Sequence, residues 1–353
     1  MKTRDMRADP PPLRWGFVGT GNIAGWMADV VGNTPAAKLA AVASRRMETA
    51  AAFATAHGAG EAFDSRERML AWDGIDAVYV ATPTALREEI CVAAAAAGKH
   101  VLGEKPFASL ASLQRITAAC RENGVAFMDA THFVHHPRTA QILAHMEQMT
   151  GRPRSLDSSF LISLTDRGDI RYDPALEPLG ALGDLGWYNM RAALEYLAPD
   201  GAVRSGSARL RHDERTGAII AGEGSLEFDN GTLSTWRCGF DAGTASIGLT
   251  LSGSRGRIHM ENFVGEEEGG TASYRYWADD AREAAGKPVH ADSPLSGPAL
   301  MFRNFAVDAR EPTLREQRMH AAERTQALLD AVRVGFDPVT GSQQEPRDEQ
   351  QRG

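Results

Sequence analysis

Three small residues near the N-terminus, Gly19, Gly21 and Ala24, form a G-x-G-x-x-A pattern that is typical of dinucleotide-binding loops. The first glycine allows a tight turn, the second lets the backbone approach a pyrophosphate, and the small third residue lets a helix pack on the preceding strand. The N–H groups at the start of that helix then face the anion. An ordinary glycine turn, or a site for another nucleotide-like ligand, is the alternative. The candidate cofactor-binding residues here are Gly19, Thr20, Gly21, Asn22 and Ile23.

The segment Ser44-Arg45-Arg46, at the end of the next expected strand, indicates which dinucleotide binds. NAD-binding proteins usually place an acidic residue at this position for the ribose 2′-hydroxyl. A hydroxyl and two guanidinium groups suit a 2′-phosphate instead, because guanidinium is always charged and offers forked donors. We therefore predict NADP(H) rather than NAD(H). The alternative is that both arginines are solvated residues at a helix start.

Asp184 and Tyr188 are two further residues whose types and spacing suit proton chemistry. They stand four positions apart, so on a helix they share one face. A tyrosine has an ordinary pKa near ~10 and transfers protons poorly at neutral pH unless a cation lies close to it. The pair therefore needs a cation from elsewhere in the chain.

From residue 13 to about residue 130, short apolar runs alternate with helical stretches. These are the first elements that must position the candidate residues. This alternation predicts a Rossmann-type, doubly wound α/β domain with a parallel sheet. The expected strands are Trp15–Val18, Leu39–Ala43, Ala77–Ala81, His100–Leu102 and Val125–Met128, and the expected helices are Met47–His57, Arg87–Ala97 and Leu110–Glu122. Such sheets bind ligands at the carboxyl ends of their strands.

The second half of the chain has a different pattern, which predicts an α+β domain with a mainly antiparallel sheet. We expect helices at Pro137–Met149 and Thr313–Val334, and strands at Ser155–Leu164, Val203–Arg211, Ile219–Phe228 and Leu233–Phe240. Asn230-Gly231 is a strong hairpin-turn signal. Residues 265–294 are expected to be mostly loop, with one strand at Ala272–Trp277.

These patterns divide the chain into four parts. We expect a disordered arm over residues 1–12, an NADP-binding domain over 13–130, a substrate-binding and oligomerisation domain over 131–340, and a disordered tail over 341–353. An open sheet face in the second domain would also need a cover, because exposed apolar sheet surface is unfavourable.

Three motifs together resemble the glucose–fructose oxidoreductase / inositol dehydrogenase / rhizopine-catabolism family over nearly the whole chain. They are the glycine-rich loop with Ala81-Thr82-Pro83-Thr84, the string AGKHVLGEKP that ends at Pro106, and the segment from Leu179 to Tyr188. The resemblance implies that Lys105 is catalytic and that Ala81, Thr82, Pro83, Arg87, Glu104 and Lys105 join the cofactor-binding set. In this family the open sheet face of the second domain commonly forms subunit contacts, so the resemblance also implies a homo-oligomer, most simply a dimer. Arg87 departs from the histidine that the family often has, and Gly183 departs from the usual apolar residue.

Lys105 would supply the cation that Tyr188 needs. An ammonium about 4 Å away, at an effective dielectric near ~20, contributes about 4 kcal/mol, which is roughly 3 pKa units as an upper bound. This would bring the phenol into the working range. The family commonly has histidine at the position of Tyr188 when it oxidises polyols, and tyrosine in members that resemble dihydrodiol dehydrogenases and deoxysugar ketoreductases.

Candidate substrate-binding residues follow the strand expected at Val125–Met128 and lie in the first part of the second domain. His132 and His135 are either substrate or nicotinamide contacts or structural histidines, and we expect no metal. Arg171 lies in Gly168–Tyr172, a string similar to one in deoxysugar ketoreductase-like members. It would hold an anionic group such as a diphosphate, or else be an exposed loop arginine. Trp187 completes the set.

The resulting hypothesis is an NADP-dependent oxidoreductase that transfers hydride between the nicotinamide and a hydroxyl or carbonyl of a sugar, keto-sugar or cyclitol. Tyr188 would supply the proton, Lys105 would lower its pKa, and Asp184 would orient the site or a substrate hydroxyl. A dihydrodiol or dicarbonyl reductase is an alternative. A non-catalytic NADP-binding regulatory protein is another, which the presence of all three residues disfavours.

Composition excludes several other classes. The chain has 38 Lys and Arg against 46 Asp and Glu, a net charge of −8, so it offers no general attraction for nucleic acid. No apolar run approaches the ~18 residues that a membrane span needs, and the first twelve residues contain no hydrophobic signal segment. We therefore expect a cytoplasmic protein. Cys91, Cys120 and Cys238 are far apart and lie in apolar segments, so we expect reduced core residues.

Overall fold

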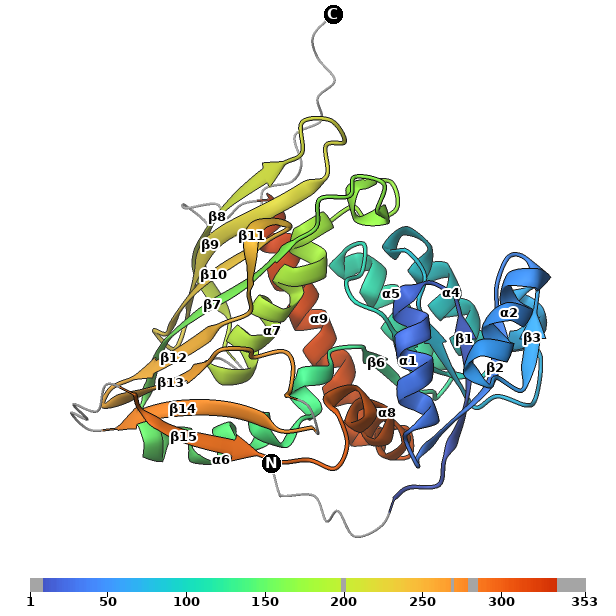
Figure 1. Cartoon of the computed structure of the whole chain (residues 1–353), viewed down its shortest axis with the longest axis horizontal. Helices are drawn as coiled ribbons and strands as arrows, with labels where there is room; N and C mark the ends of the chain where they lie inside the picture. Colours follow the sequence, from blue (N-terminus) through green and yellow to red (C-terminus); the bar gives the residue numbers. More distant parts are fainter. Residues whose placement is uncertain (1–8, 198–200, 268–269, 279–284, 335–353) are drawn as a thin grey trace, which may run out of the picture.

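The computed structural model describes residues 9–197, 201–267, 270–278 and 285–334. Its N-terminal domain is a six-stranded parallel sheet in the order β3-β2-β1-β4-β5-β6 (Figure 1). The strands are β1 (Leu13–Val18), β2 (Ala37–Ala43), β3 (Glu61–Phe63), β4 (Ala77–Val80), β5 (His100–Gly103) and β6 (Phe127–Asp129). Their helices are α1 (Asn22–Gly32), α2 (Met47–His57), α3 (Arg66–Leu70), α4 (Thr84–Ala96) and α5 (Leu110–Glu122). The predicted doubly wound fold is confirmed.

The C-terminal sheet is mixed and mostly antiparallel, as expected. Its strands are β7 (Pro153–Ser163), β8 (Val203–His212), β9 (Ile219–Phe228), β10 (Leu233–Gly239), β11 (Asp241–Ser246), β12 (Leu249–Gly253), β13 (Gly256–Met260), β14 (Ala272–Ala278) and β15 (Lys287–Ala291). They follow the order β15-β14-β13-β12-β7-β10-β9-β8, with β11 on β7. Strand β10 pairs in parallel with β7 and antiparallel with β9. The β9–β10 turn contains Gly231 at φ 79°, which confirms the predicted hairpin.

The prediction of mostly loop over 265–294 is wrong in part, because that span contains β15 besides the expected β14. Strands β11, β12 and β13 were also not expected. Several of them are short and carry polar residues, as in the DAGTAS of β11, so they lack the apolar alternation that marks a strand. Their pairing with neighbours makes them strands.

The helices of the second half are α6 (Pro137–Thr150), α7 (Trp187–Tyr196), α8 (Gly297–Asp308) and α9 (Pro312–Val334). Shorter turns are η1 (His132–His135), η2 (Ile170–Tyr172) and the π-helical η3 (Leu182–Gly186). Helices α7 and α9 lie on one face of the large sheet, and α9 runs between the two sheets (Figure 1). The C-terminal segment therefore returns to the domain interface.

Helix α8 packs on the N-terminal sheet although it follows the second domain in sequence. The ring of Phe302 lies 4.9 Å from that of Trp15, and the ring of Phe305 lies 5.1 Å from it. These aromatic rings share one buried cluster with residues of α1, β1 and β4. The apolar core of the cofactor domain is therefore completed by a distant part of the chain.

The face of the large sheet that points away from α7 and α9 is mainly polar. Side chains there bond across strands: Ser207 with Ser225 at 3.0 Å, Thr250 with His259 at 2.9 Å, and Thr235 with Asp157. The face is therefore polar at these positions, and the expected homo-oligomer stays a prediction.

Residues 9–12 of the expected arm contact helix α8 and the residues after it. The carboxylate of Asp9 pairs with Arg303 Nε at 2.7 Å, and the carbonyl oxygen of Pro11 accepts a hydrogen bond from Arg310. Residues 1–8 of that arm, and the predicted tail over 341–353, lie outside the described residues. The three cysteines are free and buried, as predicted. Within the described ranges, no helix is both long and apolar enough to cross a bilayer.

Arg191 and Asp129 form a buried ion pair at the junction of α7, β6 and α9. Arg191 Nη2 donates to Asp129 Oδ1 at 2.7 Å, and Arg191 Nε donates to Thr325 Oγ1 at 2.9 Å. Both side chains of the pair are only 4% exposed. We expect Arg191→Met to lower the free energy of unfolding by about 3–5 kcal/mol, because it leaves a buried carboxylate uncompensated.

Urea unfolding of the variant measures this loss. The exposed pair of Arg14 with Asp76 is the control, and Arg14→Met should lower the free energy of unfolding far less than Arg191→Met. Equal losses from the two variants would contradict the assignment of Arg191 as a buried structural cation.

Candidate active site

The glycine-rich loop joins β1 to α1 and has the geometry of an anion cradle. Gly19 adopts φ 111°, and a Cβ added there would lie 2.7 Å from the carbonyl oxygen of Ala81, so only glycine fits. Gly21 is the N-cap of α1, no side chain caps the helix, and a Cβ at Gly21 would meet no atom within 4 Å. The first turn of α1 carries no acidic residue. A helix N-terminus that faces open space in this way suits a phosphate.

Ser44, Arg45 and Arg46 lie directly between β2 and α2, at the same edge of the sheet. Arg46 is the N-cap of α2, and both arginine side chains are exposed. Neither forms an ion pair with a described residue. Two unpaired guanidinium groups at this edge suit the 2′-phosphate that the sequence predicted.

Arg87 is buried, and its guanidinium donates to the carbonyl oxygens of Pro106 and of Thr82, the latter at 2.6 Å. It also donates to Thr84 Oγ1 at 3.0 Å. These bonds tie the loop after β4 to the loop after β5. Contact of Arg87 with the cofactor stays a prediction.

The loop after β5 brings Lys105 to Asp184 of the second domain. Lys105 Nζ donates to Asp184 Oδ1 at 2.7 Å and to the Asp184 carbonyl oxygen at 2.7 Å. The other carboxylate oxygen, Oδ2, accepts from Arg171 Nε at 2.7 Å, and Arg171 in turn pairs with Asp169 at 3.2 Å. Four alternating charges therefore form a chain across the domain interface.

This chain of charges shifts the pKa values of its members. Burial alone would raise the pKa of Asp184, but Lys105 and Arg171 outweigh it and lower that pKa to about 2. Burial would lower the pKa of Lys105, but Asp184 outweighs it and the pKa is raised. Both groups remain charged at neutral pH. Arg171 pairs with two carboxylates of the protein while 39% of its side chain stays exposed, and its contact with an anionic substrate group stays a prediction.

Tyr188 lies beside Lys105, as the sequence predicted, but its pKa shifts in the opposite direction to the one expected. Lys105 Nζ lies 4.9 Å from the centre of the phenol ring, over its face. Burial raises the pKa of Tyr188 to about 12, and the attraction of Lys105 offsets only part of this. The phenol is therefore protonated at neutral pH. Asp184 and Tyr188 belong to the consecutive elements η3 and α7.

Glu104 precedes Lys105 and is also buried. Its carboxylate accepts a hydrogen bond from Tyr79 Oη at 2.5 Å, and a longer one from the backbone N–H of Lys105 at 3.2 Å. Burial raises its pKa. These contacts fix the loop that carries the lysine, and contact of Glu104 with a cofactor stays a prediction.

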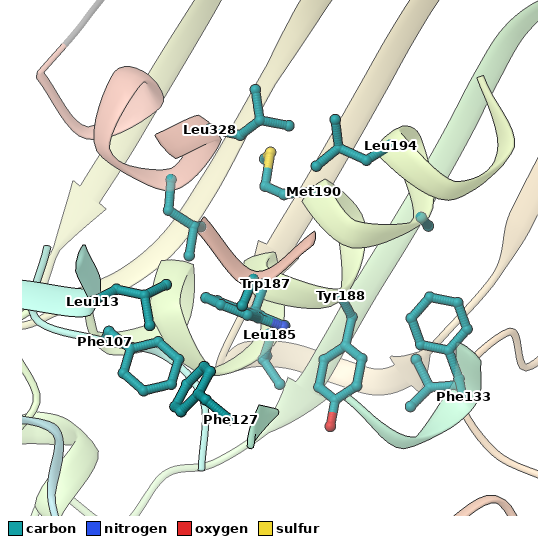
Figure 2. Close-up of a cluster of buried hydrophobic side chains, with 14 of the residues drawn as sticks. Phe107, Leu113, Phe127, Phe133, Leu185, Trp187, Tyr188, Met190, Leu194 and Leu328 are labelled. Carbon is teal, nitrogen blue, oxygen red and sulfur yellow. The ribbon is translucent and has the colours of Figure 1, made fainter. Parts of the chain in front are cut away.

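Trp187 is not a substrate contact, which corrects that prediction. Its indole is fully buried between the domains, and Nε1 donates to Thr131 Oγ1 at 2.6 Å. Figure 2 shows the indole near Phe107 and Phe127, whereas the hydroxyl of the adjacent Tyr188 points away from the cluster. The two neighbours in sequence thus serve the core and the site respectively.

The two candidate histidines differ in their surroundings. His132 lies beside the phenol, with Nε2 at 3.4 Å from Tyr188 Oη, and it is buried. His135 is buried too, but its Nδ1 lies 3.1 Å from the amide of Asn304 on α8. Only His132 therefore touches a candidate catalytic residue. Within the described ranges, no group of three or more His, Cys, Asp or Glu residues could hold a metal ion.

One contributor near the site had no signal in the sequence. The carboxylate of Glu177, from the second domain, accepts from the backbone N–H of Thr84 at 3.0 Å and from its hydroxyl at 2.5 Å. It therefore caps α4 of the first domain from 93 residues away. Only the tertiary fold brings these residues together.

The chain matches two family models. Residues 13–131 match the oxidoreductase family with an NAD-binding Rossmann fold, GFO/IDH/MocA, and residues 143–259 match the GFO/IDH/MocA C-terminal domain. The chain belongs to the GFO/IDH/MocA oxidoreductase family. The resemblance inferred from the sequence motifs is confirmed.

Relatives within this family include sugar reductases and dehydrogenases. The dTDP-3,4-didehydro-2,6-dideoxy-alpha-D-glucose 3-reductase of Streptomyces antibioticus is 31% identical over 322 residues, which cover 90% of this chain and 95% of that enzyme. The D-xylose 1-dehydrogenase (NADP(+)) 2 of Haloferax volcanii is 33% identical over 233 residues, or 65% of this chain and 70% of that enzyme.

A solved structure of KijD10, a 3-ketoreductase from Actinomadura kijaniata in complex with NADP and TDP-benzene, has a TM-score of 0.82 to this chain. It is 29% identical and covers 92% of this chain and 98% of that one. Variants of KijD10 in which a tyrosine is replaced by phenylalanine, or a lysine by alanine, have also been solved with TDP-benzene and NADP.

Proposed function

We propose that this family member is an NADP-dependent oxidoreductase that interconverts a carbonyl and a hydroxyl group on a sugar or keto-sugar. The arrangement of Lys105, Asp184 and Tyr188 carries the proposal. A protonated phenol lies over an ammonium that is fixed by a carboxylate, at the carboxyl edge of a Rossmann sheet. This is where such a sheet presents its cofactor and its substrate to each other.

The glycine-rich loop and the arginines after β2 fit NADP(H). The N-terminus of α1 would hold the pyrophosphate, and Ser44, Arg45 and Arg46 would hold the 2′-phosphate. Ala81, Thr82 and Pro83, which follow β4, lie at the same edge of the sheet. Bound there, the reduced cofactor supplies the hydride for carbonyl reduction.

Tyr188 would donate the proton that the new alkoxide needs, because its pKa of about 12 keeps it protonated at neutral pH. Lys105 would stabilise the phenolate that remains. Asp184 would hold Lys105 in place from one side, and Arg171 would hold Asp184 from the other. In the oxidative direction the same groups would accept the proton.

The names of the relatives point to two classes of substrate, which a panel of compounds would distinguish. Several act on a dTDP-linked keto-sugar, and others, by their names, act on xylose or on scyllo-inositol. We favour a nucleoside diphosphate keto-sugar, because the sugar nucleotide reductases match over nine-tenths of the chain. Turnover of free aldoses or cyclitols alone, or of dihydrodiols and dicarbonyls alone, would overturn this choice. Cofactor binding without turnover of any compound would indicate a regulatory protein.

The oligomeric state belongs to the same proposal. We favour a homodimer or a larger homo-oligomer, and light scattering at micromolar concentration measures it. A monomer alone would reject this part without affecting the chemistry.

The cofactor preference yields a prediction at Arg45 and Arg46. Replacing both by alanine should weaken NADPH binding by about 30-fold or more, since hydrogen bonds to charged groups contribute about 1.5–3 kcal/mol. The affinity for NADH should change by less than threefold, because NADH lacks the 2′-phosphate. Fluorescence titration gives both dissociation constants.

Arg68→Ala is the control for this double variant, because Arg68 is an exposed arginine that pairs with Asp64 on α3. It should leave both affinities unchanged. If the unmodified protein binds NADH more tightly than NADPH, the assignment of this segment is wrong.

A further inference from the structure

His132 lies beside Tyr188, and its ring also meets the ring of Trp26 on α1, with the two ring centres 6.0 Å apart. Its Nε2 is 3.4 Å from the phenol oxygen, which is a long hydrogen bond, and the imidazole and phenol rings meet at 61° with centres 5.8 Å apart. The residue is 8% exposed. Burial, and then Lys105, lower its pKa to about 4, so the imidazole is neutral at working pH.

The other ring nitrogen of His132 is buried and has no hydrogen-bond partner in the described part of the chain. It faces Gly297 at the start of α8, whose backbone N–H donates to both carboxylate oxygens of Glu266 at 3.0 Å. A Cβ added at Gly297 would lie 3.7 Å from His132 Nδ1 and 3.2 Å from Glu266 Oε2. The imidazole nitrogen and the carboxylate therefore border the same small space.

A buried nitrogen without a hydrogen-bond partner is unfavourable unless a further group bonds to it. Glu266 is half-buried and so connects this space with solvent. One water molecule would link Nδ1 to the carboxylate, since the site is polar on both sides.

We propose that His132 relays a solvent proton to Tyr188 along the path from Glu266, past Gly297, through the imidazole to the phenol oxygen. This proposal rests on the proposed function, in which Tyr188 donates its proton to the substrate. Each reduction consumes one proton from solvent. The path past Glu266 would supply that proton through the imidazole while cofactor and substrate stay bound.

The protons balance without a charged imidazole. The phenolate of Tyr188 takes the proton on Nε2 of His132, so that an O–H bond forms and the N–H bond breaks. At the same time Nδ1 takes a proton from the water beside Glu266, and the carboxylate returns one to that water from solvent. The ring changes tautomer and stays neutral, which agrees with its low pKa. The reverse sequence returns the ring to its first tautomer when the substrate is oxidised. Between successive reductions the ring is reset after product release, when Nε2 takes a proton from a water beside the phenol and Nδ1 releases one to the water beside Glu266.

The main test is chemical rescue of His132→Ala. We expect kcat for reduction to fall by about 10- to 100-fold with little change in KM, within the range for loss of a positioned proton-transfer group. Added imidazole should restore kcat at least fivefold, whereas N-methylpyrrole, which has a similar ring but cannot relay a proton, should not. Equal effects of the two compounds, or no loss of activity in His132→Ala, would overturn the relay.

Two further variants alter the path between Glu266 and His132 but keep the contact between His132 and Tyr188. Glu266→Gln keeps an acceptor for the Gly297 N–H but cannot carry a proton, and Gly297→Ala puts a methyl group between Glu266 and His132. Each should lower kcat three- to tenfold and raise the solvent isotope effect on kcat. Unchanged isotope effects in both would overturn the path.

Two controls distinguish a failure of the proton relay from a failure of the proposed function. His136→Ala removes a buried histidine that caps α6 and bonds to Gly270, so imidazole should not rescue any loss it causes. In the protein without cofactor, nitrogen NMR should show that Tyr188→Phe shifts the Nε2 signal of His132. If Tyr188→Phe abolishes turnover while His132→Ala does not, the relay fails alone. If Tyr188→Phe retains turnover, the proposed function fails.

Discussion

Tyr188→Phe is expected to lower kcat by about 10²- to 10⁴-fold, the range for loss of a positioned general acid. The phenol is 7% exposed and its ring packs against Phe160 and Phe133 at 5.4 and 6.3 Å, contacts that phenylalanine keeps. Cofactor affinity and substrate KM should therefore stay within a few-fold. Steady-state kinetics on the substrate found in the compound panel, with a parallel NADPH titration, measures both.

Tyr196→Phe is a matched control for this variant. Tyr196 lies on the same helix, is buried to 1% exposure, and burial raises its pKa to about 12 as well. Its hydroxyl contacts Thr139 at 3.3 Å, away from Lys105. Loss of this hydroxyl should change kcat less than twofold. Turnover in Tyr188→Phe within a few-fold of the unmodified enzyme would reject the proton-donor role.

The pH profile gives an independent check. With a pKa of about 12, Tyr188 is protonated throughout the neutral range, so its titration should leave kcat for reduction unchanged there. The oxidative reaction needs the deprotonated phenol, and its rate should increase as pH rises towards that pKa. A decrease in kcat for reduction near pH 7 that arises from titration of Tyr188 would contradict this high pKa.

The fold was predictable where the signal is local. Helices Met47–His57 and Leu110–Glu122 were expected with the bounds that the structure shows. Strand β3 has only three residues, and β11 is held by its neighbour β7. Neither shows the alternation of apolar and polar residues that predicts a strand. Helix α8 was missed because it packs on the sheet of the first domain, which the local sequence does not reveal.

The site was predictable to the extent that motifs mark it. Lys105 and Tyr188 were identified from motifs. The structure places Lys105 Nζ 4.9 Å from the centre of the Tyr188 ring, although the two residues are 83 positions apart in the chain. The net effect on the phenol was not predictable, because attraction to Lys105 was considered without the burial that opposes it. Arg87 and Trp187 were candidates from the sequence, but the contacts they make were not predictable from it: Arg87 donates to Thr84 and to the carbonyl oxygen of Thr82, and Trp187 donates to the hydroxyl of Thr131.

Lys105→Met is expected to lower kcat by about 10²- to 10³-fold, comparable to the loss of one preorganised stabilising group in an enzyme site. The ammonium opposes the effect of burial on Tyr188, so its removal should raise the phenol pKa above about 12. The phenolate left after proton donation then becomes less stable. In the oxidative direction, the rise of rate with pH should move to higher pH, which a pH profile of kcat detects.

Lys99→Met is the control, because Lys99 donates to the carbonyl oxygens of Trp72 and Ile75 and touches no catalytic group. Its kcat should change less than twofold. If Lys105→Met has an unchanged oxidative pH profile and merely a raised KM, the lysine binds substrate and does not act on Tyr188.

The same substitution has a consequence for stability that depends on pH. In the folded protein Lys105 and Arg171 hold the pKa of Asp184 at about 2, below its ordinary value near ~3.9. A lowered folded-state pKa stabilises the fold above the ordinary value, and this contribution disappears as pH falls towards 2. Lys105→Met removes one of the two cations, so its deficit in urea unfolding should be complete above about pH 4 and shrink between pH 4 and 2. A deficit that stays constant over this window would mean that packing of the lysine side chain, rather than its charge beside Asp184, stabilises the junction of the two domains.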